Sequence, residues 1–163
     1  MVLPFSWLTV IHEHTIRLRV AFSDTDMAGI VHFSNYFRYM EAAEHDFFRK
    51  LGYSIVTRIG DHEYGWPRVH VECRFSHPLR FENEFEIRLM VQDLSRRSIH
   101  YVFEFTKLEP EGEKILLGRG SMVAVCVEHD PVSRGLRSVE IPHEIACLIR
   151  RPPREPHLNA ESY

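Results

Sequence analysis

The fold of this chain turns on residues 24–36, which read DTDMAGIVHFSNY, because a strand pattern ends before this stretch and a helix pattern begins within it. Before it, apolar residues alternate with polar ones from Ile16 to Phe22, which indicates a half-buried strand over residues 14–22. After it, apolar residues recur at helical spacing over residues 34–51. Ser34 is the predicted N-cap of this helix and Gly52 its C-terminal stop.

Four further strand patterns follow, over residues 69–75, 84–92, 98–108 and 114–127. Their short connections imply antiparallel neighbours, so we expect an α+β fold with one long helix packed on an antiparallel sheet of about five strands. The apolar positions of the helix cover more than a narrow stripe, which predicts a helix largely wrapped by the sheet. We divide the chain into an N-terminal extension (1–13), one domain (14–149) and a proline-rich, mobile C-terminal tail (150–163).

The composition excludes several classes of function. The 163 residues carry a formal net charge of −3, which argues against nucleic acid as the main partner. The apolar runs are shorter than the ~18 residues that a spanning helix needs, so no membrane insertion is expected. Three cysteines without CxxC spacing, and a start without a secretory pattern, predict a reduced, cytoplasmic protein. His12 and His14 flank Glu13 without further ligands nearby, so we predict no metal and no cofactor.

The stretch 24–36 also contains carboxylates next to a predicted helix start, which are groups that could take part in a reaction. The start of a helix leaves backbone N–H groups without partners and carries a positive partial charge. A carboxylate held in front of such an end could serve acyl transfer, because the free amides would stabilise negative charge on a carbonyl oxygen. The structural alternative is that Asp24 and Asp26 only form a turn or a cap.

Residues 24–36, with Met40-Glu41-Ala42-Ala43 behind them, resemble the signature of the 4-hydroxybenzoyl-CoA thioesterase family. The resemblance extends over residues 15–128 and includes Trp66-Pro67 and the segment from His77 to Phe81. It implies the hotdog fold, in which an antiparallel sheet wraps a long helix. It also implies a homodimer or homotetramer with active sites at the subunit interface and an acyl-CoA substrate.

The resemblance assigns the catalytic carboxylate to Asp26 and leaves Asp24 as a turn or supporting residue. The thioester oxygen would then lie against backbone N–H groups near Gly29 and Phe33. Some family members have tyrosine or histidine where this chain has Phe33, so only the backbone of that residue could contribute. His32 either compensates for the missing side chain or is an ordinary loop histidine. Asp26 would attack the carbonyl directly or deprotonate a water molecule, and the sequence does not choose between the two.

Other residues are weaker candidates for the site. Arg96, Arg97 and Ser98 occupy a turn between two predicted strands, where the arginines could hold the phosphates of CoA or simply be solvated. Asn35 and Tyr36 open the helix and could line the acyl pocket, although Tyr36 is equally suited to the core. Glu41 and Glu44 on the same helix are fallback bases, because related hotdog enzymes use a helix glutamate; the usual reading of both is a solvated or ion-paired face.

These observations predict an acyl-CoA thioesterase that acts on a small aromatic or short-to-medium acyl group. Three alternatives stay open: a thioesterase acting on acyl-carrier protein, a hydratase-like lyase and a non-catalytic acyl-CoA binder. Hotdog hydratases pair an aspartate with a histidine, as Asp26 and His32 could, but the asparagine-proline step between them is missing.

Overall fold

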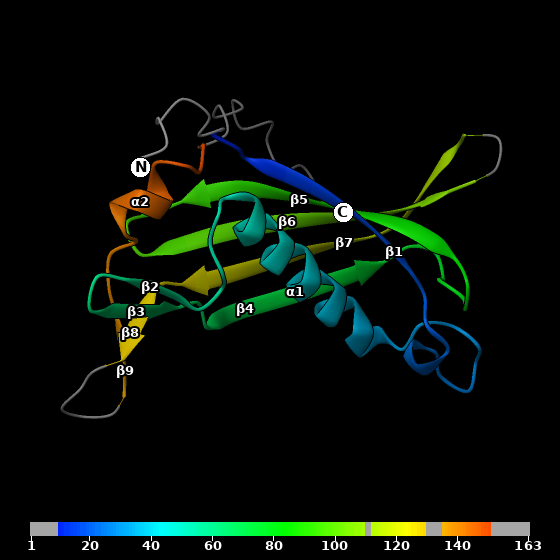
Figure 1. Cartoon of the computed structure of the whole chain (residues 1–163). Coiled ribbons are helices and arrows are strands. Elements are labelled where there is room, and N and C mark those ends of the chain that lie inside the picture. Colours follow the sequence, from blue (N-terminus) through cyan, green and yellow to red (C-terminus); the bar gives the residue numbers. More distant parts are fainter. Residues whose placement is uncertain (1–9, 110–111, 130–134, 151–163) are drawn as a thin grey trace, which may run out of the picture.

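A five-stranded antiparallel sheet carries one long helix, α1 (Phe33–Lys50), on one of its faces (Figure 1). The computed structural model describes residues 10–109, 112–129 and 135–150. The strand order in the sheet is β1-β5-β6-β7-β4. The bounds of these strands are β1 Glu13–Arg19, β4 Arg68–Phe75, β5 Glu84–Leu94, β6 Ser98–Leu108 and β7 Lys114–Val125. This arrangement confirms the predicted hotdog fold, with strand β4 at one edge of the sheet and β1 at the other.

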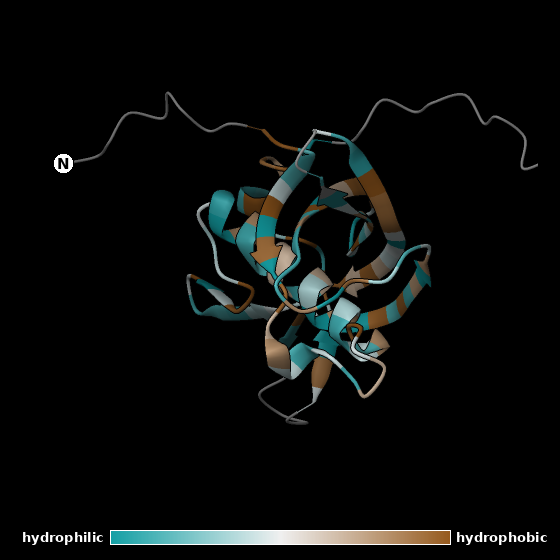
Figure 2. Cartoon of the chain, turned by 90° about the vertical axis from the view of Figure 1, so that its right-hand side faces the viewer, coloured by the Kyte–Doolittle hydropathy of each residue, from teal (hydrophilic) through white to brown (hydrophobic). Residues whose placement is uncertain are grey.

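The core lies between α1 and the inner face of the sheet. Brown and teal bands alternate along the strands in Figure 2, as expected for strands with one buried and one exposed face. Met40, Phe47 and Phe48 of the helix are fully buried. Gly120 on β7 allows the helix to come close, because a Cβ atom at that position would lie 2.8 Å from the Met40 Sδ atom.

A second sheet of four strands was not predicted. It has the order β2-β3-β8-β9, formed by β2 (Thr57–Ile59), β3 (His62–Gly65), β8 (Val127–His129) and β9 (Leu136–Ser138). The same end of the domain contains a short helix, α2 (His143–Ala146). Strands of three or four residues are too short to produce a clear alternation of apolar and polar residues, so they could not be predicted.

The boundaries of the predicted elements need small corrections. The first strand ends at Arg19 because residues Phe22–Asp24 form the 3-10 helix η1. The last predicted strand ends at Val125, and the chain passes after Cys126 into the second sheet. Helix α1 starts at Phe33 with His32, not Ser34, as its N-cap. Gly52 follows the helix with a φ of 88°, the left-handed conformation typical of a helix stop.

The two ends of the domain meet through the backbone. Ile11 donates to Leu148 O at 3.0 Å, and Arg150 donates to Ile11 O at 2.9 Å. The domain therefore reaches slightly beyond the predicted limits of 14 and 149 on both sides. The rest of the predicted tail, residues 151–163, and residues 1–9 of the predicted extension lie outside the described residues.

Candidate active site

The loop between η1 and α1 is closed by its own backbone. The Asp26 amide donates to Ile30 O at 2.9 Å, and the His32 amide donates to Asp24 O at 2.9 Å. Gly29 allows the chain to reverse between them, with a φ of 72° that L side chains rarely adopt. The result is a tight hairpin-like loop that presents Asp26 just before the start of the helix.

Asp24 ties this loop to helix α1. Its carboxylate accepts hydrogen bonds from the Tyr39 hydroxyl at 2.8 Å and from the Ala21 amide at 3.2 Å. Its carbonyl oxygen accepts a further bond from Asn35 Nδ2 at 2.8 Å. Asp24 is thus hydrogen-bonded both to the helix and to the turn before the loop. Asp26 is the exposed carboxylate of the pair.

The start of α1 keeps a donor available. The His32 Nδ1 atom lies 2.8 Å from the Ser34 hydroxyl and accepts a long, 3.4 Å bond from the Ser34 amide. Within the described residues, no hydrogen bond engages the amide of Phe33. This amide belongs to the first residue of the helix, where the partial positive charge of the helix is concentrated.

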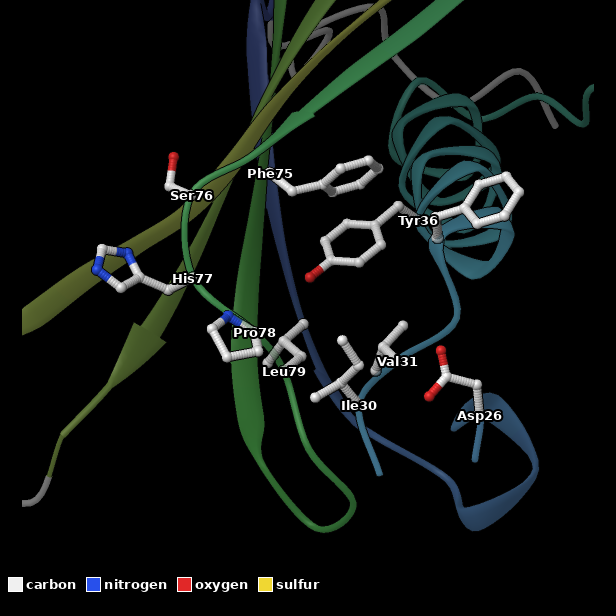
Figure 3. A pocket seen from close by; sticks show the side chains of 10 residues that line it. Asp26, Ile30, Val31, Tyr36, Phe75, Ser76, His77, Pro78 and Leu79 are labelled. Atoms are coloured by element: carbon white, nitrogen blue, oxygen red, sulfur yellow. The ribbon is translucent and has the colours of Figure 1, made fainter. Parts of the chain in front are cut away.

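Asp26 and Phe33 line a common pocket of about 360 Å³. Its walls come from the loop, the start of α1 and the connection that follows β4 (Figure 3). The lining residues are Asp26, Ile30, Val31, Phe33, Tyr36, Phe75, Ser76, His77, Pro78 and Leu79. The cavity thus combines a carboxylate, apolar walls and the first residue of a helix, an arrangement suited to a substrate with a reactive carbonyl and an apolar acyl group.

The structure therefore brings three of the predicted site residues together: Asp26, Phe33 and Tyr36. It does not support Gly29 as a donor, because the Gly29 amide donates to Asp26 O at 2.9 Å inside the turn and Gly29 does not line the pocket. Asn35 is directed at the loop backbone and lines no part of the pocket.

His32 also has a different place from that of a substrate-binding residue. Its ring packs on Phe33 with a centroid distance of 4.5 Å and caps the helix through Nδ1. It is absent from the pocket lining. The structure thus assigns it a capping role that the sequence analysis gave to Ser34.

Arg96, Arg97 and Ser98 lie at the opposite end of the sheet from the pocket of the same chain. Ser98 is paired with Val125 on β7, whereas Phe75 beside the pocket is paired with Gly118 on the same strand. Seven residues of strand separate the two positions, which corresponds to about 23 Å. Arg96 forms an ion pair with Glu140, and the side chains of both arginines are exposed. Within one protomer these residues cannot join Asp26 in a compact site.

The two fallback bases are also outside the pocket. Glu44 is completely buried and accepts hydrogen bonds from Arg68 Nε at 3.1 Å and Nη2 at 2.5 Å. Burial raises the pKa of Glu44 to about 7, an effect that Arg68 opposes. Glu41 lies 3.4 Å from the same guanidinium. Neither glutamate lines the cavity that contains Asp26.

Two walls of the pocket were not predicted from the sequence. The connection from Phe75 to Leu79 forms one wall, and Ile30 and Val31 form another. The amide of Val31 donates to Leu79 O at 2.8 Å, so the two walls are joined directly. The signal was present in the resemblance, which included His77 to Phe81, but a proline-containing connection gives no pattern that marks it as a pocket wall.

Neither a metal-binding cluster nor a membrane-spanning helix is found among the described residues. Over residues 10–109, 112–129 and 135–150, no three His, Cys, Asp or Glu side chains are grouped so that they could hold a metal ion. No helix in the same ranges is long and apolar enough to cross a membrane.

The sequence and the fold of this chain are similar to those of known thioesterases. A family model described as the thioesterase-like superfamily matches residues 20–148. A protein of Aquifex aeolicus that carries an esterase name without a substrate is 33% identical over 82% of this chain and 95% of its own length. A 1,4-dihydroxy-2-naphthoyl-CoA hydrolase of Gloeothece citriformis is 29% identical over 77% of this chain and 82% of its own length.

The 4-hydroxybenzoyl-CoA thioesterase of Pseudomonas sp. strain CBS-3 is similar in both respects. Its sequence is 28% identical over 78% of this chain and 91% of its own length. Its solved structure matches this one with a TM-score of 0.72 at 24% identity, covering 85% of this chain and 99% of that chain. At this level of identity the structural match supports the fold.

Proposed function

The chain belongs to the thioesterase-like superfamily, and on that premise we propose that it hydrolyses the thioester of a small aromatic acyl-CoA with Asp26 as the catalytic carboxylate. The observation that carries the proposal is that Asp26 lines the same pocket as Phe33, the helix residue whose amide has no hydrogen-bond partner within the described residues. The aromatic acyl group is supported by the apolar and aromatic walls of that pocket and by the substrates named for two relatives.

In the proposed reaction, the carbonyl oxygen of the thioester accepts a hydrogen bond from the Phe33 amide. Asp26 then attacks the carbonyl carbon to form an anhydride, or removes a proton from a water molecule that attacks instead. The carbon–sulfur bond breaks and CoA leaves as a thiolate, which needs little help from an acid because thiols have a pKa of about 8.5. Water cleaves the anhydride if one forms, and the products are the free acid and CoA.

We also propose that the working unit is a homodimer joined through strand β4. This strand is an edge of the sheet, and it exposes the apolar side chains of Val69, Val71 and Phe75. An edge of this kind is a template for pairing with another chain. Antiparallel pairing of two β4 strands would place the Arg68 end of one beside the Phe75 end of the other, and hence beside the pocket.

Such a dimer would give Arg96 and Arg97 the role predicted from the sequence. The backbone of Arg97 accepts from Cys126 at 2.8 Å, next to Pro67 and the start of β4. Arg97 of the partner subunit would then lie about three strand spacings, or ~14 Å, from the pocket, instead of ~23 Å within one protomer. That distance suits an extended CoA molecule with its acyl group at Asp26 and its phosphates at the partner.

The proposal is tested by thiol release from a panel of aromatic and aliphatic acyl-CoA thioesters with the variants Asp26→Asn, Glu41→Gln and Glu44→Gln. We expect Asp26→Asn to lower kcat by about 10²–10⁴-fold while substrate binding is retained, because a general base or nucleophile contributes that much. The two glutamate variants make the same change from carboxylate to amide and should keep their activity. An active Asp26→Asn, or an inactive Glu44→Gln that is folded, would overturn the assignment.

The same assay separates the other functions. A much faster reaction with acyl-carrier protein than with the matched acyl-CoA would assign the substrate to the carrier. Addition of water to an enoyl-CoA without thiol release would indicate a lyase. For the dimer, Arg97→Ala should raise KM about tenfold for acyl-CoA and leave KM for the acyl-pantetheine unchanged, since only CoA carries the nucleotide phosphates.

A further inference from the structure

The inner part of the pocket contains a phenol whose hydroxyl is available to a ligand. Tyr36 is only 3% exposed, and its ring packs in edge-to-face geometry on Phe75 at 4.8 Å and on Phe105 at 5.2 Å between ring centroids. Two aromatic contacts and a helical backbone fix the direction of the ring. Figure 3 shows the hydroxyl pointing toward Pro78 and Leu79, into the cavity that Asp26 also lines.

The walls around this hydroxyl are apolar. Ile30, Val31, Phe75 and Leu79 supply carbon atoms to the inner part of the pocket. The other core tyrosine phenols are used differently, because the Tyr39 hydroxyl donates to Asp24 and the Tyr101 hydroxyl is buried. A polar group placed among apolar walls can fix the orientation of a ligand and reject ligands that lack a matching group.

The surroundings determine which kind of group Tyr36 would recognise. Burial raises the pKa of Tyr36 to about 12, and the nearby Leu79 backbone opposes this rise. The phenol is therefore protonated at neutral pH and can donate its O–H proton. A matching group on a ligand is then an acceptor.

Resting on the proposed function, we infer that Tyr36 determines specificity by donating a hydrogen bond to an oxygen on the acyl group of the substrate, on the side away from the thioester. The preferred substrates are then acyl groups with a hydroxyl or carbonyl oxygen at that position, and unsubstituted rings are handled poorly. Asp26 and Phe33 act on the thioester, whereas Tyr36 donates a hydrogen bond to the far end of the acyl group.

The test compares benzoyl-CoA with 3-hydroxybenzoyl-CoA and 4-hydroxybenzoyl-CoA on the full-length wild-type protein and on Tyr36→Phe. We expect the wild type to prefer at least one hydroxylated thioester in kcat/KM by about tenfold, which corresponds to the loss of one hydrogen bond. Tyr36→Phe should lose that preference through a lower kcat/KM for the hydroxylated thioester, while kcat/KM for benzoyl-CoA changes by less than about twofold. Tyr101→Phe removes a core phenol hydroxyl outside the pocket lining and should keep the wild-type preference.

Binding supplies a readout that does not depend on turnover. Calorimetric titration of the same thioesters into Asp26→Asn and into Asp26→Asn/Tyr36→Phe should show the preference in the first variant and its loss in the second. An equal loss of kcat/KM on all three thioesters in Tyr36→Phe would indicate a packing role and overturn the inference. A wild type that prefers benzoyl-CoA, or binds all three thioesters equally, would overturn it too, whereas a preference in binding without any thiol release would overturn only the proposed hydrolysis.

Discussion

Two carboxylates associated with helix α1 have opposite environments. Asp26 is exposed in the loop before the helix, and its Oδ1 atom accepts only the Ala28 amide, at 2.8 Å, among the described residues. Glu44 is buried in the middle of the helix, is paired with Arg68 and has a raised pKa. Perturbed and buried groups are common at active sites, and by that criterion Glu44 would be chosen. The pocket, however, is at Asp26.

A buried, perturbed carboxylate can thus belong to the architecture of a fold, while the carboxylate that lines the pocket lies in a loop. Two other buried polar atoms, Tyr101 Oη and Trp66 Nε1, have no hydrogen-bond partner within the described residues, and the same is true of Glu44 Oε1. The core around the middle of the helix thus contains buried polar atoms that reduce the stability of the fold, and it is not part of the pocket. Mutations there should change the stability of the fold, and mutations in the loop should change the reaction.

The largest expected effect is on stability, from Arg68→Leu. Above pH 7, where Glu44 is ionised in the wild type, this variant leaves the carboxylate buried without its cation, and breaking a buried pair in this way typically costs about 3–5 kcal/mol. The free energy of unfolding in urea, at one protein concentration, measures the loss. The double variant Glu44→Leu/Arg68→Leu is the control, because it removes both charges and should recover most of the stability. A loss below about 1 kcal/mol in the single variant would mean that Glu44 is not held by this pair.

The pH dependence of stability should reveal Glu44 next. Its pKa is about 7 in the folded protein and near the ordinary value of 4.5 in the unfolded chain, so the folded state binds more protons between these values. The contribution of Glu44 is therefore fully present below about pH 4.5 and is lost as the pH rises through 7. Over this range the wild type should lose up to about 3 kcal/mol of unfolding free energy relative to Glu44→Gln, which does not titrate at this position. A difference that is independent of pH would contradict the raised pKa.

Much of this organisation could be predicted from the sequence. The alternation in strands such as Ile16 to Val20, and the helical spacing from Tyr36 to Phe47, depend only on local periodicity, and the structure confirms both. The position of Asp26 before a helix start likewise follows from order along the chain. These features are read correctly because neighbours in sequence determine them.

The features that could not be predicted depend on contacts between distant segments. Leu79 joins the pocket wall because its carbonyl oxygen accepts a hydrogen bond from the Val31 amide. Arg68 donates a hydrogen bond to Glu44 because strand β4 lies beside the helix. A glutamate in the middle of a helix looks solvated or ion-paired on spacing alone, so its complete burial gave no sequence signal. The distance from Arg97 to the pocket of the same chain had no sequence signal either, because it depends on how strands β4 and β6 align with β7.

Gly29→Ala tests the loop half of the comparison between Asp26 and Glu44. A Cβ atom at this position would have space, since its nearest neighbour is Arg80 Nη1 at 3.8 Å, so the cost is confined to the positive φ of 72°. That conformation costs an alanine about 1–2 kcal/mol. We expect a lower melting temperature together with a several-fold lower kcat, because the loop that carries Asp26 must distort. Gly60→Ala, at a φ of 59° far from the pocket, is the control and should lower stability by a similar amount while kcat is unchanged.

The smallest effect is expected from Tyr39→Phe, which tests whether the loop depends on the helix beneath it. The Tyr39 hydroxyl donates to Asp24 Oδ2 at 2.8 Å, and both burial and this hydrogen bond raise the pKa of Tyr39. Removing the hydroxyl should cost about 1 kcal/mol or less, because Asp24 keeps its bond from the Ala21 amide. If the loop is held as described, kcat falls a few-fold while KM for the acyl-CoA stays constant, since Asp26 is displaced and the pocket walls are not. A change in KM alone would mean that Tyr39 supports the pocket instead of the loop, and Asp26 would then owe its position to the backbone bonds around Gly29.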